Sequence, residues 1–331
     1  MPHTAARAPR RALLAAAAAA LALCAGGSAL AQDAPFPTKP VRIIIPTAPG
    51  GNLDVLARIV AAKLNDLWGQ PVIVESRPGA NTILATSYVA KSPADGYTAL
   101  FTISGFVQNL VLQPNPQYKM SDLAPVSIVA SFPIALAANA QLPADDLAGV
   151  IRLAKAAPEK YSFASYGVGS GGHIIGEGLN RAAGVRIKHV AYKGEAASFP
   201  DLVSGNIGLS YGSTGFYANQ IGTGKVKIIA VASASRLPTF PNVPTFAEAG
   251  YPDINLPGWG AMFVPAGTPA AVVDKYVAAV RQIVQMPDVK EKILQFGFVP
   301  VGNTNTEFAH FLQEDLQRWT KIVRENDIRL E

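Results

Sequence analysis

The sequence predicts an α/β protein built from two lobes, and three observations lead to that fold class. Two of them are stretches with one shared architecture, in which an apolar strand runs into an uncharged, glycine-rich loop that opens a helix: residues 41–54 and 161–173. The third is length. Without a predicted leader, 300 of the 331 residues remain, which exceeds one typical hydrophobic core.

The first 31 residues read as a secretory signal peptide rather than as part of the fold. Arg7, Arg10 and Arg11 form a positive n-region, and residues 12–25 form an apolar run. Ala29-Leu30-Ala31 is a small-residue cleavage site. The apolar run is too short for a membrane span. We therefore expect cleavage after about Ala31 and a periplasmic protein. Lipidation at Cys24 stays an alternative, which the bulky Leu23 before it disfavours.

Charge and cysteine content exclude several classes of protein. The chain has 28 basic and 23 acidic residues, and three of the basic ones lie in the leader, which leaves 25 and 23. Without a basic run or stripe, nucleic acid is not an expected partner. Cys24 is the only cysteine, so the mature chain has no disulfide or thiol nucleophile. Its histidines lie at no metal-ligand spacing, and we expect neither a metal nor a cofactor.

The first third of the mature chain alternates strands and helices. Strands are expected at 41–46, 71–75 and 97–104, with helices at 54–68 and 83–91. Right-handed crossovers build a parallel sheet from this order. The loops at the carboxyl ends of such strands form the usual ligand crevice.

An extended stretch at 125–138, interrupted by Pro133, is expected to carry the chain into the second lobe. A helix at 145–157 follows, then strands at 161–165, 187–192, 207–211 and 226–232. A proline-rich return at 237–244 leads to a strand at 259–265 and helices at 270–284, 288–296 and 306–326. Lobe 1 is therefore predicted as 35–130 plus 236–331, and lobe 2 as 131–235.

The two glycine-rich loops predict where a ligand binds. Bare backbone N–H groups beside a helix N-terminus favour an anion, so two such loops suggest lobes that close on one small acidic ligand. The predicted binding residues come from these loops and from neighbouring strand ends: Thr47, Ala48, Gly50, Gly51, Asn52, Asn81, Thr82, Ser104, Ser165, Gly169, Ser170, His173, Tyr192 and Lys193.

For each of three residues near the loops, the sequence is compatible with two roles. His173 either faces the ligand as a donor or holds the loop through a backbone bond. Asp54 caps a helix, which is worth around 1 kcal/mol, or fixes Gly50–Asn52 so that their amides converge, and both roles are compatible. Lys193 ends a strand, where it acts as a counter-charge or as a solvated lysine.

Two enzyme motifs are alternatives to binding. Gly167–Gly172 satisfies G-x-G-x-x-G, as in a dinucleotide-binding enzyme, with Glu195 roughly where a ribose-binding acid would fall. Export to a compartment with little nicotinamide cofactor argues against it. Gly208–Gly212 satisfies G-x-S-x-G, as in an exported α/β hydrolase that uses Ser210 and His310. His310 lies in an ordinary helical pattern, which argues against that reading.

Blocks spread over the mature chain resemble one family. They are residues 36–46 with Ala48–Asp54, 75–80, 95–98, 165–173 with Glu177, 192–194, 241–245, 248–250 and 265–269. Together they resemble the receptors of tripartite tricarboxylate transporters, also called Bug-type solute-binding proteins. The resemblance implies a type II-like, Venus-flytrap periplasmic-binding-protein fold with a ligand cleft between the lobes and no catalysis. It also implies that loops 47–54 and 165–173 hold a ligand carboxylate through amides, hydroxyls and ordered water.

The same resemblance implies the partners. These are a small organic acid and the permease subunits of a tripartite tricarboxylate-type transporter, served by a monomeric receptor. The chain departs from many relatives at Thr47, Leu53 and Asn52, which stand in place of an aromatic residue, a hydroxyl residue and a glycine. Ser210–Ser213 replaces a stretch that often carries an acid. Ligand identity therefore does not follow, and a bulkier or less carboxylate-rich ligand is compatible with the sequence.

Overall fold

The computed structural model describes residues 36–50 and 52–325. Contacts divide the chain after Thr38, and the architecture given below is that of Lys39 onward. The predicted signal peptide, Cys24, Gly51 and the last residues of the predicted lobe 1 lie outside the described residues. Within the described part, no helix is long and apolar enough to cross a bilayer.

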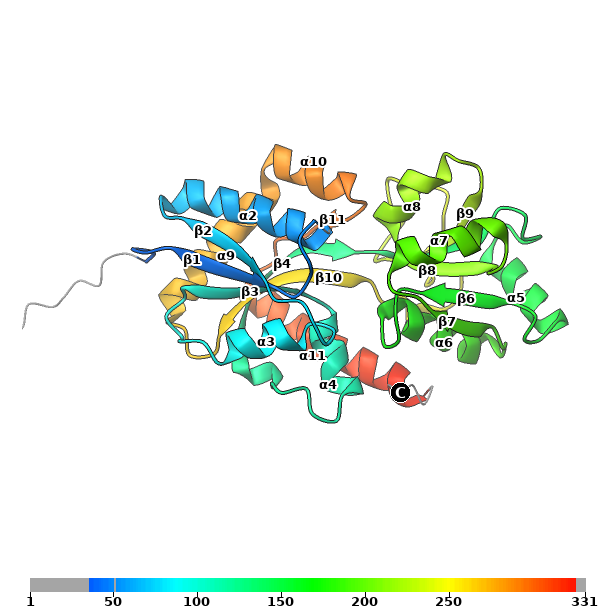
Figure 1. Ribbon diagram of the computed structural model, residues 1–331, viewed down its shortest axis with the longest axis horizontal. Coiled ribbons are helices and arrows are strands. Elements are labelled where there is room, and N and C mark those ends of the chain that lie inside the picture. The colour runs from blue at the N-terminus through cyan, green and yellow to red at the C-terminus, as the bar shows by residue number, and fades with distance from the viewer. Residues whose placement is uncertain (1–35, 51, 326–331) are drawn as a thin grey trace, which may run out of the picture. The chain divides into compact units, whose positions relative to one another are not determined.

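Two mixed sheets with helices on their faces confirm the predicted α/β class and its two lobes (Figure 1). Among the described residues the first sheet has six strands in the order β11-β4-β10-β3-β1-β2. Their bounds are β1 Val41–Ile45, β2 Val72–Ser76, β3 Thr98–Ile103, β4 Leu123–Phe132, β10 Gly258–Pro265 and β11 Val299–Pro300. The second sheet has five, in the order β7-β6-β8-β5-β9. These are β5 Ile134–Asn139, β6 Ser162–Ser165, β7 Lys188–Ala191, β8 Leu209–Ser213 and β9 Val226–Ala232.

The parallel part of the first sheet is as predicted. β1 pairs in parallel with β2 on one side and β3 on the other, and its Ile43, Ile44 and Ile45 are fully buried. A continuous apolar run of this kind suits a strand covered on both faces. The antiparallel pairs of β10 with β3 and β4 were not predicted. They form because the chain comes back from the second lobe before it makes β10.

Helices cover both faces of the first sheet. They are α2 Asn52–Trp68, α3 Ile83–Ala90, α4 Gly105–Leu112, α9 Ala270–Gln285, α10 Pro287–Gln295 and α11 Asn305–Glu325. Figure 1 shows α3, α4 and α11 on one face and α2, α9 and α10 on the other. Sequence reasoning missed α4, whose first residues, from Gly105 to Asn109, are all buried. A helix buried on all sides lacks the polar face that gives helical periodicity.

The second sheet carries α5 Leu147–Ala156, α6 Gly171–Ala183, α7 Glu195–Ser204 and α8 Thr214–Ile221. β6 pairs in parallel with β7 and β8, whereas β5 runs antiparallel to β8 and β9. The chain enters this sheet at Pro133, between β4 and β5. β4 therefore extends to Phe132, slightly past the predicted boundary at residue 130.

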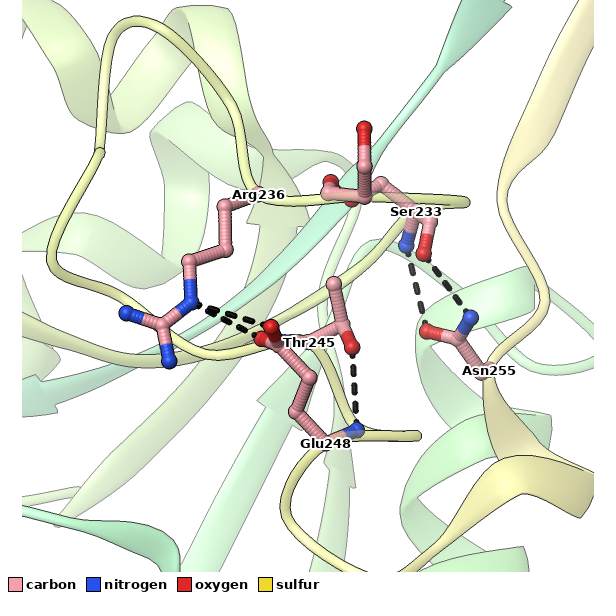
Figure 2. Close-up of polar contacts among 6 residues, drawn as sticks. Ser233, Arg236, Thr245, Glu248 and Asn255 are labelled. Atoms are coloured by element: carbon pink, nitrogen blue, oxygen red, sulfur yellow. Dashed lines mark hydrogen bonds and ion pairs between the residues drawn. The ribbon is translucent and has the colours of Figure 1, made fainter.

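The return segment between β9 and β10 is irregular but tightly bonded (Figure 2). Thr245 and Glu248 form a reciprocal capping pair, in which the Thr245 amide donates to Glu248 Oε2 at 2.8 Å and the Glu248 amide donates to Thr245 Oγ1 at 3.0 Å. Arg236 Nε donates to both Glu248 oxygens at 3.1 and 3.0 Å. Asn255 bonds twice to the main chain of Ser233, at 3.2 and 2.8 Å, so both ends of the segment are tied together.

A buried carboxyl lies in the core of the first lobe. Asp315 of α11 is only 2% exposed and accepts a hydrogen bond from Trp259 Nε1 of β10 at 2.9 Å. Burial raises the pKa of Asp315 to about 6. The hydrogen bond fixes α11 on the sheet, but water is not available to stabilise the ionised form.

The backbone of α8 lies directly against the backbone of the turn that follows α10. A methyl group added at Gly215 would lie 1.7 Å from the carbonyl oxygen of Phe296, and one at Gly297 would lie 2.4 Å from the Gly215 nitrogen. Thr214 Oγ1 donates to the Gly297 carbonyl at 2.6 Å. Because α8 belongs to the second sheet and β11 after this turn to the first, only glycine permits this approach between the lobes.

Candidate ligand site

A cavity of about 540 Å³ lies between residues of the two lobes. Its wall is mostly apolar, with a few polar groups. From the first lobe it is lined by Thr47, Leu53, Asn81, Ile103, Ser104, Gly105, Gln108, Phe132, Gly258 and Phe298. From the second it is lined by Ile134, Tyr166, Gly167, Val168, Ser170, Gly171, Glu195 and Ser213, with Pro133 at the crossing. Such a pocket suits an organic solute with an apolar body.

The predicted binding residues divide into three groups by position. Those on the cavity wall are Thr47, Asn81, Ser104 and Ser170. Those that do not line it are Ala48, Gly50, Thr82, Ser165, Gly169, His173, Tyr192 and Lys193. Gly51 lies outside the described residues, and Asn52 is placed as the first residue of α2. Ligand contact by any of them stays a prediction.

Thr47 lies directly beyond β1 and carries an unsatisfied hydroxyl. Its carbonyl accepts a hydrogen bond from Ser76 Oγ, which fixes the main chain at the strand end. Its Oγ1 is buried and has no hydrogen-bond partner among the described residues. A buried hydroxyl without a partner costs free energy. Because Thr47 lines the cavity, a ligand oxygen would satisfy it.

The amide of Gly50, which was expected to face the ligand, is turned inward. Gly50 N–H donates to Asp54 Oδ2 at 2.9 Å. The Arg58 guanidinium donates to the same carboxylate and holds the pKa of Asp54 below its ordinary value, against the effect of burial. Asp54 therefore fixes the loop, as one of its two interpretations predicted, but it does so by occupying a predicted donor.

Asn81 is held at the cavity by an unusual backbone. Three consecutive residues, Ala80, Asn81 and Thr82, have positive φ angles of 47°, 44° and 83°. Non-glycine residues in this region are strained by about 1 kcal/mol or more each. The Asn109 amide of α4 offsets this by donating to the Asn81 carbonyl and, at 3.2 Å, to Thr82 Oγ1. Strain of this kind clusters where a site must be held in one geometry.

The start of α4 brings two polar side chains to the wall. Ser104 precedes the helix, and its amide donates to the Trp259 carbonyl at 3.2 Å. Gln108 lies one turn further on and is only 4% exposed. Among the described residues its side-chain amide has no hydrogen-bond partner, although it lines the cavity. Gln108 was missed because it stands alone in an apolar run.

In the second lobe, most amides at the start of α6 are already used. Gly169 N–H donates to His173 Nδ1 at 3.1 Å, and Gly172 N–H donates to Tyr166 Oη at 3.2 Å. Ser170 caps the helix by accepting from the His173 amide. The Gly171 amide is different, because it has no acceptor among the described residues and lies on the cavity wall. The helix N-terminus therefore offers one free N–H at the cavity.

His173 supports the loop rather than the cavity wall. Besides the bond from Gly169, its ring stacks on His189 with centroids 3.9 Å apart and an angle of 11°. Ser165 Oγ lies 2.7 Å from His189 Nε2. Since His173 Nδ1 accepts a hydrogen bond, the ring is the neutral tautomer that carries its proton on Nε2. Of its two interpretations, the geometry supports the one in which His173 holds the loop.

Acid should destabilise this histidine pair. Burial lowers the pKa of both rings, that of His189 to about 4, with the His173 ring adding to the effect. Because the folded state favours the neutral rings, stability is highest above pH 6.5, the ordinary histidine pKa, and is lost as pH falls towards 4. We expect the melting temperature to fall over this range in thermal denaturation, and the fall to be smaller in His189→Gln. An identical pH profile for the variant would contradict this.

Tyr192 and Lys193 follow β7 but point to other partners. Tyr192 Oη donates to Asp201 Oδ2 at 2.6 Å, and its amide donates to the Ser165 carbonyl at 3.0 Å. Lys193 is exposed. The carboxylate that sequence reasoning considered only for ribose, Glu195, lies instead on the cavity wall. Its position depends on the α7 start and on β8, which are not adjacent in sequence.

Comparisons with known proteins identify the family of this chain. Residues 56–328 match the tripartite tricarboxylate transporter family receptor profile, TctC. The chain belongs to this receptor family. It is 35% identical to protein BugT of Bordetella pertussis over 298 residues, which is 89% of this chain and 91% of BugT.

Solved structures share the fold of the receptor. A structure of a periplasmic transporter is 33% identical, with a TM-score of 0.78, and the match covers 89% of this chain and 100% of that one. R. palustris Rpa4515 with adipate is 30% identical, also with a TM-score of 0.78, over 89% of this chain and 99% of that one. The predicted family and the two-lobed binding-protein fold are confirmed.

Both enzyme alternatives are wrong. Receptors of this family are non-enzymatic binding proteins. Ser210 lies in the middle of β8, fully buried, and its Oγ accepts a hydrogen bond from Tyr217 Oη at 2.8 Å, so it forms no nucleophile elbow. In the glycine-rich loop, the Gly169 and Gly172 amides that would face a pyrophosphate are occupied by His173 and Tyr166.

Proposed function

We propose that this receptor captures a small carboxylate-bearing solute in the 540 Å³ cavity and delivers it to the membrane subunits of a tripartite tricarboxylate-type transporter. The signal peptide predicted at residues 1–31 would place it in the periplasm. Lobe 1 (35–130 and 236–331) and lobe 2 (131–235) would close on the ligand, which adds contacts available only in the closed form. The solved structure of R. palustris Rpa4515 with adipate supports a carboxylate ligand.

The observation that carries the proposal is a set of free donors on one cavity. Thr47 Oγ1 and the Gln108 amide come from the first lobe, and the Gly171 N–H at the start of α6 comes from the second. Neutral donors beside a helix N-terminus stabilise an anion without a cationic side chain. A carboxylate that reached all three would bridge the two lobes and favour closure.

A thermal-shift screen of the ligand-stripped protein against a library of carboxylic acids tests this proposal. A ligand at about 100 times its Kd stabilises the folded state by about 2.7 kcal/mol, which raises the melting temperature by several degrees. If no acid in a broad library raises it, the proposal fails.

Removal of the free donors should weaken the binding of any acid that the screen finds. Thr47→Val and Gln108→Leu keep side-chain volume but lose a hydrogen bond to a charged group, which is worth about 1.5–3 kcal/mol. We expect each to raise the Kd about tenfold to a hundredfold by calorimetry. Thr86→Val is the matched control, because Thr86 Oγ1 is also buried without a partner but does not line the cavity. Equal losses in Thr47→Val and Thr86→Val would contradict the assignment.

A further inference from the structure

One formally charged side chain lies on the cavity wall among the described lining residues. It is Glu195, the first residue of α7. Both of its oxygens accept hydrogen bonds from Ser213, which donates its amide to Oε1 at 2.8 Å and its hydroxyl to Oε2 at 2.9 Å. A carboxyl that accepts on both oxygens is used as a carboxylate. Each oxygen retains a further lone pair for another donor.

Within residues 36–50 and 52–325, no ion pair compensates this carboxylate. The described lining residues include no Lys or Arg. The titratable neighbours that act on or respond to Glu195 are the phenols of Tyr166 and Tyr217, and burial raises the pKa of both. Burial also raises the pKa of Glu195, and the two Ser213 bonds oppose that shift. Glu195 is half-buried, and a carboxylate that is partly removed from water without a cation is costly unless something else supplies positive charge.

Glu195 lies on the same wall as the free amide of α6. A methyl group added at Gly171 would lie 2.9 Å from Tyr166 Oη, and one added at Gly212 would lie 3.3 Å from the Glu195 carboxyl carbon. Gly212 precedes Ser213 at the end of β8, and Ser213 pairs with Ile134, which also contacts the Gly171 position. The anion-binding helix start and the lone carboxylate are therefore parts of one continuous surface.

We infer that the ligand carries an ammonium group as well as a carboxylate, with the ammonium bound by Glu195. This inference rests on the proposed function, because it assigns the other end of the same ligand. The carboxylate meets Gly171, Thr47 and Gln108, while the apolar body lies against Phe132 and Phe298, whose rings are 4.2 Å apart at their centroids. A second carboxylate in place of the ammonium would meet Glu195 with like charge.

Four six-carbon acids test the inference by calorimetry on the ligand-stripped receptor: caproate, norleucine, ε-aminocaproate and adipate. All four have six carbons and one carboxylate. Caproate has no second charged group, norleucine and ε-aminocaproate add an ammonium, and adipate adds a second carboxylate. We expect one of the two amino acids to bind about tenfold to a hundredfold more tightly than caproate, since hydrogen bonds to charged groups contribute that much. Adipate should bind most weakly.

Glu195→Gln should abolish this preference, because the amide keeps an acceptor for the Ser213 N–H but has no charge. Adipate should then gain relative to the amino acids. Glu177→Gln is the matched control: Glu177 is a half-buried carboxyl of α6 whose pKa is also raised by burial, but it does not line the cavity. The control should keep the native preference.

The outcomes separate the two proposals. If no acid binds, in this series or in the wider library, the proposed function fails. If acids bind but caproate or adipate equals the amino acids in the native receptor, carboxylate capture stands and the ammonium inference is overturned. An unchanged preference in a folded Glu195→Gln variant overturns it as well. Should that variant not fold, the native order of affinities decides alone.

Discussion

Gly215→Ala should hold the lobes apart and cost the receptor most of its ligand affinity. The added methyl would lie 1.7 Å from the Phe296 carbonyl oxygen, which is main chain and cannot rotate away. The two segments belong to different lobes, so separation of the lobes relieves the overlap without unfolding either. Overpacking typically costs about 1–3 kcal/mol. If this free energy destabilises only the closed state, ligand affinity falls about fivefold to a hundredfold.

Calorimetry on Gly215→Ala and small-angle scattering with saturating ligand measure the effect. The variant should show a larger radius of gyration than the native protein when both are liganded. Gly222→Ala, at the end of the same helix, is the matched control, because a methyl group there meets nothing within 4 Å. Native affinity together with native compaction in Gly215→Ala would show that the lobes do not close at this contact.

Asp315→Asn should stabilise the receptor at neutral pH. The pKa of Asp315 is raised from 3.8 to about 6 by burial, so the folded state pays for ionisation that the unfolded state does not. Because the folded-state pKa is raised, the protonated carboxyl makes its full contribution to stability below pH 3.8. That contribution is lost as pH rises through about 6. The difference corresponds to about 3 kcal/mol above pH 7. Asparagine keeps an oxygen for Trp259 Nε1 and avoids this cost.

Chemical denaturation from pH 4 to pH 8 distinguishes this effect from a change in packing. Asp315→Asn and the native protein should agree in unfolding free energy near pH 4 and diverge as pH rises. Asp253→Asn serves as the surface control, since Asp253 forms an exposed ion pair with Lys321 at 2.7 Å, which contributes little. A constant offset between Asp315→Asn and native protein at every pH would mean that the carboxyl does not titrate as proposed.

Strands with continuous apolar runs were the most predictable parts of the fold. β9 begins and ends as predicted, and the break at Pro133 separates β4 from β5. Such runs are set by local composition and by proline, which cannot donate to a sheet. β11 is only two residues long and forms because it meets β4, so no local pattern marks it.

The position of the cavity was predictable, but which groups on its wall are free was not. Both glycine-rich loops lie by the cavity, as their strand–loop–helix pattern indicated. The Gly50 and Gly169 amides are occupied because the Asp54 and His173 side chains turn back onto them. That choice depends on rotamers and burial rather than on spacing. Gln108 and Glu195 reach the wall through α4 and α7, whose packing only the assembled lobes determine.

The two hydrogen bonds between the Asn255 side chain and the Ser233 main chain reduce the number of places at which the receptor can pivot. Thr245, within the return segment, also bridges to Val231 of β9. These contacts attach the segment to the second lobe, although Asp253 within it also pairs with Lys321 of α11 in the first lobe. We expect the chain to bend near Pro133 and Pro257, which lie on either side of the segment in the chain. Since proline fixes its own φ at about −65°, the backbone torsions that change during closure are those of the residues beside each proline. A fluorescent dye attached between residues 234 and 248 would therefore move with the second lobe and report its motion.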